Sequence, residues 1–381
     1  MTGLLILTVA LGVLAYWKRA ELVRLRAVMT LFAPDRIVHN FSNMNELFHT
    51  TPVPRGAGPV SELPRGAPMS APEGWEDWLA RHAVTSIVVL ENGAIVHESY
   101  LQGTGQDDLR VTWSVAKSWF SALFGVLVAE GHLESLDDEV VKYAPQLRGS
   151  AYDGASIRNV LNMASGVEFN EDYLDFWSDI NRMGRVLAIG GSMDKFAMRL
   201  GGRMAPPGEK WQYVSIDTHV LGMVARGATG RAIPDLISER IVAPMGLESE
   251  PYYLTDIYGT AFVTGGLNMR TRDFARFGQM FLQEGFWNGR QIVPRDWALE
   301  STRPSAPTVP GELRYGYQWW IPETGPEGEF LARGVYGQYV YVNRPAGVVV
   351  AVTSADRQFR EAGVFEDSLA MFRSLAAHLS E

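Results

Sequence analysis

The order of hydrophobic and polar positions along the chain predicts strands near both ends and helices between them. β-Branched runs over residues 86–90 and 94–100 flank the turn-forming pair Asn92-Gly93, which is typical of a β-hairpin. Helical periodicity dominates over residues 114–282. The folded part of the chain is therefore expected to open with a hairpin and to continue into a long helical region.

Strand patterning returns over residues 315–321, 338–342 and 348–353, and an amphipathic helix is predicted over residues 363–379. Because strands occur near both ends, the economical fold is an antiparallel sheet in which N-terminal and C-terminal strands pair. Helices would cover the faces of this sheet, and a largely helical region would be inserted in it. The predicted fold class is therefore α/β (α+β).

An apolar run without any charge occupies residues 3–17, and Lys18 and Arg19 follow it directly. As a helix it spans roughly 22 Å. The hydrocarbon core of a bilayer is roughly 30 Å thick, and snorkelling of the two basic side chains narrows that gap. The next residues, AELVRLRAVMTLF, are typical of a basic amphipathic helix on a lipid surface. We predict a membrane anchor and amphipathic helix over residues 1–33; a cleaved signal peptide and a buried core helix stay open as alternatives.

Composition narrows the remaining classes of protein. Pro and Gly concentrate in residues 51–74, which favours an extended connection over residues 34–74 before a main domain at 75–381. A net charge of −9 argues against nucleic acid as a partner. The absence of cysteine excludes disulfides, thiolate catalysis and cysteine-ligated zinc. His97-Glu98 lacks a second histidine at metalloprotease spacing, and we predict neither a metal nor an organic cofactor.

The candidate chemistry begins with the tetrad Ser114-Val115-Ala116-Lys117. Residues three apart share a helix face, so the lysine amine can lie beside the serine hydroxyl and accept its proton. The spacing alone is weak evidence, because Ser192-Met193-Asp194-Lys195 repeats it. The first copy opens a strongly apolar helix after the hairpin, whereas the second follows two glycines and is typical of a helix N-cap. The context therefore favours the first copy.

Five segments in a fixed order make the pattern specific. They are VTWSVAKSWFSALFGVLVAEGHLESLDD, IRNVLNMASGVEF, PPGEKWQYVSIDTHVLGMV, GGLNMRTRDFARFGQMFLQEGFWNGRQIVPRDW and ARGVYGQYVYV. Together they resemble the class C β-lactamase and penicillin-binding-protein family from about residue 75 to the C-terminus. Within it, NFSNMNELF and GQYVYV are most similar to the esterase and 6-aminohexanoate-dimer hydrolase branch.

The resemblance implies a serine hydrolase that forms an acyl-enzyme. Ser114 would be the acylated nucleophile, Lys117 would activate it, and Tyr213 of the Tyr-x-Ser motif would act as base or acid toward the leaving group. The substrate would be a small-molecule amide or ester. A packing tyrosine in an aromatic-rich segment is the alternative interpretation of Tyr213.

The same resemblance implies four further site residues. Backbone N–H groups of Ser114 and Val335 would form the oxyanion hole, with Gly334 as the glycine that ends the third motif. Ser215 would hydrogen-bond Lys117 or the substrate, and a plain turn serine is its alternative. Tyr173 resembles a substrate-contacting tyrosine of the amide-hydrolase branch, and a surface aromatic is its alternative.

One departure from the family qualifies the expected activity. The third motif reads Ala332-Arg333-Gly334, so its lysine or histidine is missing. The loss argues against an efficient β-lactamase or D,D-peptidase, and the alternation of strand side chains points Arg333 away from its neighbours' face.

Two further expectations concern the cellular location of the protein and an alternative function. The resemblance favours an inner-membrane-anchored protein with a periplasmic catalytic domain, although the basic residues after the apolar run favour the cytoplasm. The alternative function is a membrane-anchored accessory protein on an inactive scaffold, with a membrane protein as its partner.

Overall fold

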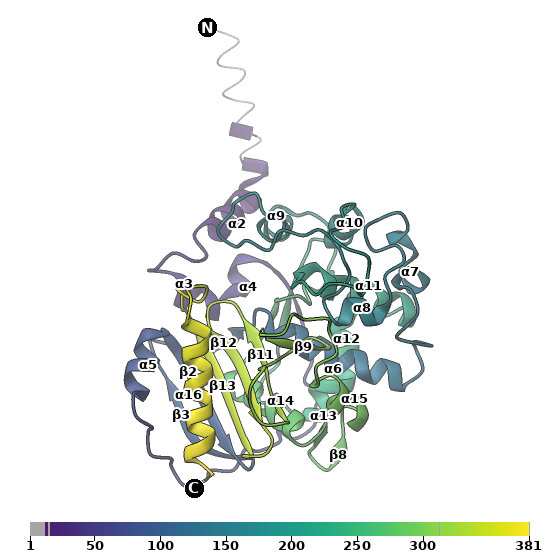
Figure 1. Ribbon diagram of the computed structural model, residues 1–381. Coiled ribbons are helices and arrows are strands. Elements are labelled where there is room, and N and C mark those ends of the chain that lie inside the picture. Colours follow the sequence, from purple (N-terminus) through teal and green to yellow (C-terminus); the bar gives the residue numbers. More distant parts are fainter. Residues whose placement is uncertain (1–11, 14–15, 312, 381) are drawn as a thin grey trace.

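The computed structural model describes residues 12–13, 16–311 and 313–380 (Figure 1). Within these residues the largest sheet has seven antiparallel strands in the order β3-β2-β13-β12-β11-β10-β9. Their bounds are β2 Val84–Glu91, β3 Ala94–Tyr100, β9 Arg314–Gly316, β10 Trp319–Ile321, β11 Glu329–Gly334, β12 Gln338–Asn343 and β13 Val348–Ser354. Val89 of β2 lies opposite Val350 of β13, so the predicted pairing of N-terminal and C-terminal strands is confirmed.

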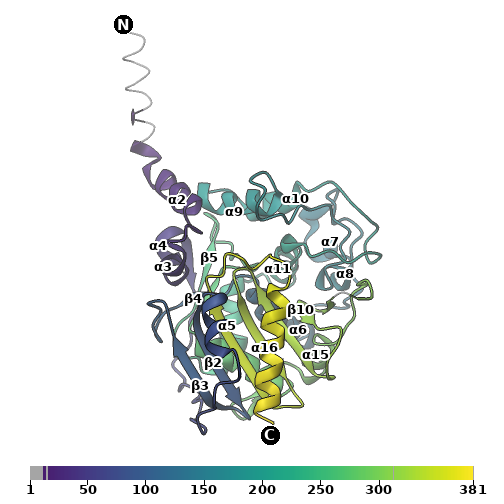
Figure 2. The same cartoon turned by 60° about the vertical axis from the view of Figure 1, so that its left-hand side comes forward.

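Helices cover both faces of this sheet (Figures 1 and 2). On one face lie α5 (Trp75–Arg81) and α16 (Val364–His378), and on the other lie α6 (Val115–Ala129) and α14 (Thr271–Leu282). Alternate strand residues serve the two cores: Tyr341 packs with Phe372 of α16, whereas Val340 belongs to the larger core around α6 and α14. Because successive side chains of a strand point to opposite faces, one set packs on α16 and the other set packs on α6 and α14.

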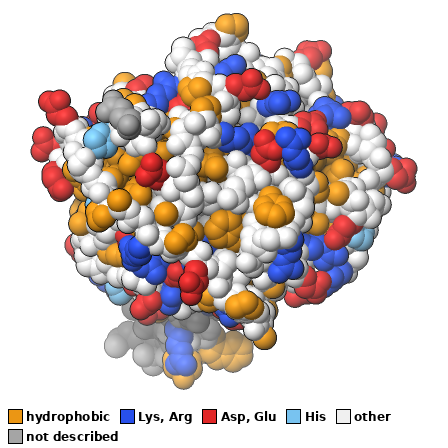
Figure 3. Space-filling model, turned by 90° about the horizontal axis from the view of Figure 1, so that it is seen from below, with side chains coloured by type: hydrophobic (Ala, Val, Ile, Leu, Met, Phe, Trp, Pro, Cys, Tyr) orange, Lys and Arg blue, Asp and Glu red, His pale blue; other side chains and the backbone are white. Residues whose placement is uncertain are grey.

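A largely helical region is inserted between the N-terminal and C-terminal strands of the sheet, as predicted, and it lies to one side of the sheet (Figure 1). Its elements are α7 Val140–Tyr143, η1 Pro145–Leu147, α8 Ile157–Leu161, α9 Asp179–Ile189, α10 Met193–Met198, α11 Ser215–Thr229, α12 Ile233–Ile237, η2 Ser238–Val242, α13 Ala243–Met245 and α15 Arg295–Glu300. On the face seen in Figure 3, acidic and basic side chains are interspersed with small apolar spots.

A second, smaller sheet was not expected from the sequence. It has the order β1-β5-β6-β4, and a separate two-stranded hairpin pairs β7 with β8. The bounds are β1 His49–Pro52, β4 Arg110–Val111, β5 Tyr252–Thr255, β6 Leu267–Met269, β7 Phe286–Trp287 and β8 Arg290–Gln291. These strands are only two to four residues long and most pair over long distances along the chain, so local periodicity does not reveal them. The single strand expected over residues 315–321 is in fact the β9–β10 hairpin, which turns at Gln318 with φ of +68°.

The structure corrects the expected membrane anchor. Most of the apolar run at residues 3–17 lies outside the described residues, and among the described ones no helix combines the length and the apolar character needed to cross a bilayer. That finding overturns the prediction of an inner-membrane anchor with a periplasmic domain. The helix α2 (Arg19–Met29), expected on a lipid surface, contacts α9, and Leu22, Val23 and Met29 on it are exposed. The segment 34–74, expected to be extended, also contains α3 (Ile37–Ser42) and α4 (Met44–Leu47).

Candidate active site

Ser114 stands at the start of α6, where that helix meets the end of β11. Trp119, Phe120 and Leu123 of α6 are fully buried and fix the helix in the core. Trp113, directly before the serine, has φ of +44°, a left-handed conformation that is costly for a tryptophan. The strained residue turns the chain from β4 into α6, and the serine lies at this turn.

Lys117 lies one helical turn after Ser114 and points back toward it. Its side chain is only 2% exposed. The amine nitrogen Nζ donates to Ser114 Oγ at 2.8 Å and to the backbone oxygen of Thr264 at 2.6 Å. Burial lowers the pKa of Lys117 to about 7, against an opposing effect of the nearby Glu171 carboxylate. The amine is therefore substantially neutral near neutral pH.

Tyr213 precedes α11 and lies on the other side of this pair. Its ring stacks on Trp320 with centroids 5.1 Å apart, and Lys117 Nζ lies 5.3 Å from its ring centroid. Burial raises the pKa of the phenol, and the Glu171 carboxylate raises it further. The nearby Ser114 hydroxyl and the positive charge of Arg333 act in the opposite direction. The phenol therefore stays protonated at neutral pH.

Glu171 is a site residue that the sequence did not single out. It accepts hydrogen bonds from the Ser215 backbone N–H at 3.0 Å, from the Ser215 hydroxyl and from the Tyr173 hydroxyl at 2.7 Å. Burial raises the pKa of this carboxyl, whereas the charge of Lys117 lowers it. The hydroxyl of Ser215, expected on Lys117 or substrate, is thus turned to Glu171. The only signal in the sequence was an acidic segment, FNEDYLD, which does not tell one carboxylate from its neighbours.

The end of β11 approaches the start of α6 very closely. A Cβ at Gly334 would lie 3.1 Å from the backbone nitrogen of Ser114 and 2.8 Å from the backbone oxygen of Thr112. Only glycine fits here without a shift of backbone. In the part of the chain that the structure describes, neither the Ser114 N–H nor the Val335 N–H has an acceptor in the protein. Two such donors beside a nucleophile are suited to hold an oxyanion.

Arg333 occupies the strand position that the sequence pointed away from its neighbours' face. Its guanidinium lies 4.2 Å from the ring centroid of Phe365 and 5.7 Å from that of Trp320. Near the end of β11, Arg333 lines a cavity together with Ser114 and Tyr213. A positive charge therefore reaches the site region although the third motif lacks its usual base.

Two cavities meet at Ser114, and every predicted site residue lines at least one of them. One cavity, of about 650 Å³, reaches Ser114, Lys117 and Ser215. The other, of about 570 Å³, reaches Ser114, Tyr213 and Gly334. Tyr173 and Val335 line both. Across the described residues, no group of three or more His, Asp or Glu side chains is placed to hold a metal ion.

The fold and this cluster define a serine hydrolase of the β-lactamase class, and comparison with known proteins agrees. The model of the family described as Beta-lactamase matches residues 79–370, so the chain belongs to the β-lactamase family. The resemblance drawn from the motifs is confirmed.

Individual relatives point to the amide-hydrolase branch. A 6-aminohexanoate-dimer hydrolase from Paenarthrobacter ureafaciens is 29% identical over 349 residues, which cover 85% of this chain and 88% of the relative. A solved structure from Bacillus anthracis, provisionally assigned as a 6-aminohexanoate-dimer hydrolase, has a TM-score of 0.82 at 23% identity and covers 92% of this chain and 96% of its own. A D-stereospecific amidohydrolase from a Streptomyces species has a TM-score of 0.57 at 21% identity, covering 77% and 98%. At these identities the two structures support the fold alone.

Proposed function

We propose that the protein hydrolyses a small-molecule ester or amide through an acyl-enzyme on Ser114. The observation that carries the proposal is the buried amine of Lys117, 2.8 Å from Ser114 Oγ and with a pKa lowered to about 7. A neutral amine at that distance is suited to accept the serine proton. The relatives named above support an amide or ester bond as the target.

In the proposed first step, Ser114 Oγ attacks the substrate carbonyl carbon while its proton passes to Lys117 Nζ. The N–H groups of Ser114 and Val335 hold the developing oxyanion. The bond from the carbonyl carbon to the leaving oxygen or nitrogen then breaks. Tyr213, whose raised pKa keeps it protonated, delivers a proton to the leaving group and is reprotonated from Lys117.

Water completes the cycle. It attacks the acyl carbon, its proton passes to the Lys117–Tyr213 pair, and the bond to Ser114 Oγ breaks with return of a proton to that oxygen. Glu171 acts as a positioning residue in this proposal: it holds Ser215 and Tyr173 at the mouth of the site, and its charge tunes the pKa of Lys117. Arg333 offers a positive charge on the leaving-group side.

Covalent labelling tests the proposal directly. A serine-directed fluorophosphonate should add one adduct to the intact protein, and an activated ester should give a burst of product equal to the enzyme concentration. Ser114→Ala should abolish both signals. Ser192→Ala, which changes the other S-x-x-K tetrad, is the matched control and should label like the wild type. Equal labelling of Ser114→Ala would overturn the assignment.

A further inference from the structure

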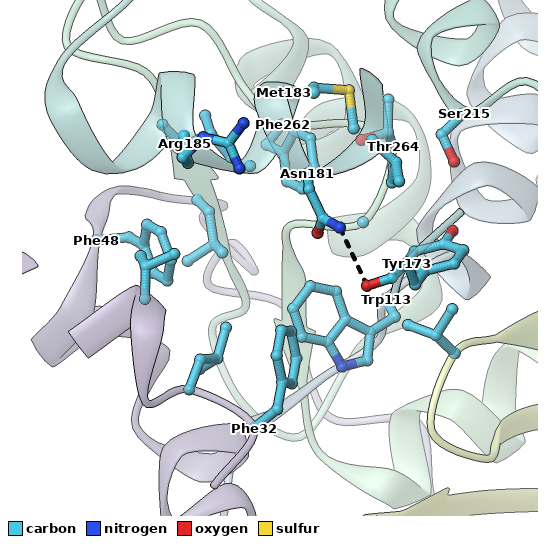
Figure 4. A pocket seen from close by; sticks show the side chains of 18 of the residues that line it. Phe32, Phe48, Trp113, Tyr173, Asn181, Met183, Arg185, Ser215, Phe262 and Thr264 are labelled. Carbon is cyan, nitrogen blue, oxygen red and sulfur yellow. Dashed lines mark hydrogen bonds between the residues drawn. The ribbon is translucent and has the colours of Figure 1, made fainter. Parts of the chain in front are cut away.

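The cavity on one side of Ser114 is deep and continues well past the catalytic groups. It runs from Ser114 and Lys117 toward a wall formed by α2, α4 and α9. In Figure 4, Phe48 lies on the opposite side of the cavity from Ser215, and Phe32 and Met183 lie between them. A site for a short acyl group does not need this depth, so we expect the far end of the cavity to bind a further part of the ligand.

The lining of this cavity is apolar along its length. Among the described residues that line it, Lys117 and Arg185 are the only ones of the Lys, Arg, Asp and Glu types, and burial lowers the pKa of Lys117 to about 7. The Arg185 guanidinium is engaged, since it donates to the backbone oxygen of Phe176 and lies 4.1 Å from that ring's centroid. The amide of Asn181 is also engaged and donates to the backbone oxygen of Tyr173 at 3.0 Å (Figure 4). The wall therefore offers apolar contact with little polar recognition.

The mouth has the same character. Leu174 is 85% exposed and Phe176 is 54% exposed, and both line the cavity. Large apolar side chains in solvent beside an apolar cavity are typical of an entry for an apolar ligand.

The position of Tyr213 fixes which part of a substrate each cavity receives. Tyr213, the proposed proton donor to the leaving group, lines the second cavity and is not among the residues that line the apolar one. The second cavity also contains charged side chains, among them Arg333, Arg360 and Glu361. The leaving alcohol or amine would therefore occupy the charged side, and the acyl group would extend to the apolar side.

We infer that the preferred substrates carry an unbranched, uncharged acyl chain of medium to long length, held in the cavity between α2 and α9. This inference rests on the proposed function and names its substrate class. The cavity volume is about 650 Å³. A methylene needs about as much space as a water molecule, about 30 Å³, so a chain of roughly eight to fourteen carbons fits with room to move.

A series of p-nitrophenyl esters from acetate to hexadecanoate, each below its critical micelle concentration, tests the inference. A fully buried methylene improves kcat/KM by at most about fourfold. We expect a rise of at least about a hundredfold from acetate to an optimum between octanoate and tetradecanoate, then a fall. A burst with acetate and no rise with chain length would overturn this inference and leave the acyl-enzyme intact. No burst with any ester would instead remove the proposed function.

Gly184 provides a variant that narrows the cavity. It lies on α9, lines the cavity, and a Cβ built on it meets nothing within 4 Å. Gly184→Trp should lower the ratio of kcat/KM for dodecanoate to that for acetate by at least about tenfold. Gly184→Ala, which adds little volume, should keep the wild-type ratio. Gly201→Trp, at an exposed glycine with equally open surroundings, should keep both the ratio and the acetate rate.

Labelling with ethyl and dodecyl fluorophosphonates gives a second measurement that does not depend on turnover. The dodecyl reagent should react faster with the wild type, and Gly184→Trp should remove that advantage. An unchanged ratio in Gly184→Trp, with Ser114 still labelled, would place the chain elsewhere and overturn the inference.

Discussion

Two segments of this chain share the pattern S-x-x-K, and the structure gives them different tasks. In the first, Ser114 and Lys117 are joined by a hydrogen bond of 2.8 Å, and the lysine is buried. In the second, the Ser192 hydroxyl accepts from the backbone nitrogen of Lys195 at 3.3 Å, and the Lys195 side chain is exposed. The same spacing thus yields a buried, hydrogen-bonded serine–lysine pair in one place and a helix cap in the other.

Backbone conformation and burial account for the difference. Ser192 has extended φ and ψ of −108° and 124°, which directs its hydroxyl to the free N–H groups of α10. Ser114 already has helical angles of −67° and −6°, and its hydroxyl does not cap α6. Asp194, inside the second tetrad, pairs with His219 and Arg226 of α11. A hydroxyl that caps a helix and an amine in solvent do not form a reactive pair. A hydroxyl that caps no helix and lies beside a desolvated amine can pass its proton to that amine.

The largest contrast is expected from removal of the two hydroxyls. Ser114→Ala should lower kcat/KM for an activated ester by about 10⁴-fold or more, because no acyl-enzyme can form. Ser192→Ala should stay within about twofold of the wild type, since a lost cap changes stability and not the site. Initial rates with one ester, corrected for the uncatalysed reaction, make the comparison. Similar losses in both variants would erase the distinction between the tetrads.

Removal of the two amines should separate activity from stability. Lys117→Met is expected to lower kcat/KM by roughly 10²–10⁴-fold, whereas Lys195→Met should leave it unchanged. Lys117→Met should also raise the free energy of unfolding by on the order of 1 kcal/mol, because a buried amine is unfavourable. The matched control on the same helix is Ser121→Ala. It removes the hydrogen bond from Ser121 to the Tyr317 backbone oxygen, so its free energy of unfolding should fall by about 1 kcal/mol.

The pH dependence of the free energy of unfolding tests whether Lys117 is desolvated in the folded protein. The pKa of Lys117 falls from 10.5 to about 7 on folding, so the unfolded chain binds more protons between these values. Wild-type stability should gain from this group as pH rises through that window, and the gain should vanish in Lys117→Met. Urea unfolding at pH 7 and pH 9 measures it. If the free energy of unfolding changed equally with pH in the wild type and in Lys117→Met, the amine of Lys117 would not be desolvated.

A smaller effect is expected from the carboxylate beside the first tetrad. The kcat/KM of the wild type should rise with pH through about 7 as Lys117 loses its proton. The charge of Glu171 raises that pKa, so Glu171→Gln should move the rising limb to lower pH. Glu168→Gln, at an exposed carboxylate in the same segment, should keep the wild-type profile. A limb that moves to higher pH in Glu171→Gln would contradict the assigned interaction.

The residues that the sequence predicted share one property: each belongs to a local motif. The hairpin at 84–100, the apolar helix after Ser114 and the tyrosine before α11 all have short-range signals. The order of the five segments added the family, which confirmed the fold and the class of enzyme. Local signals thus sufficed for the strands of the large sheet near both ends of the chain and for the choice of Ser114 as candidate nucleophile.

What the sequence did not predict depends on contacts between distant segments. Glu171 acquires its role because the loop after α8 folds onto Ser215, 44 residues further on. The backbone oxygen of Thr264, which holds Lys117, is 147 residues away from it. The helix α2 was assigned to a lipid surface because its apolar residues have no local partner; in the structure it contacts α9, while Leu22, Val23 and Met29 stay exposed. Periodicity reports that a face is apolar and leaves open what covers it.

The smallest effect concerns the second tetrad alone. If the Ser192 hydroxyl acts as an N-cap, Ser192→Ala should lower the free energy of unfolding by about 1 kcal/mol, whereas Ser192→Asp, which restores an acceptor, should stay within a few tenths. The midpoint of urea unfolding at pH 7 measures both, and both should retain wild-type ester hydrolysis. An equal loss in the two variants would mean that the hydroxyl is not a cap. The rescue by aspartate is decisive because an acceptor is all a cap requires, whereas the nucleophile proposed at position 114 cannot be replaced in this way.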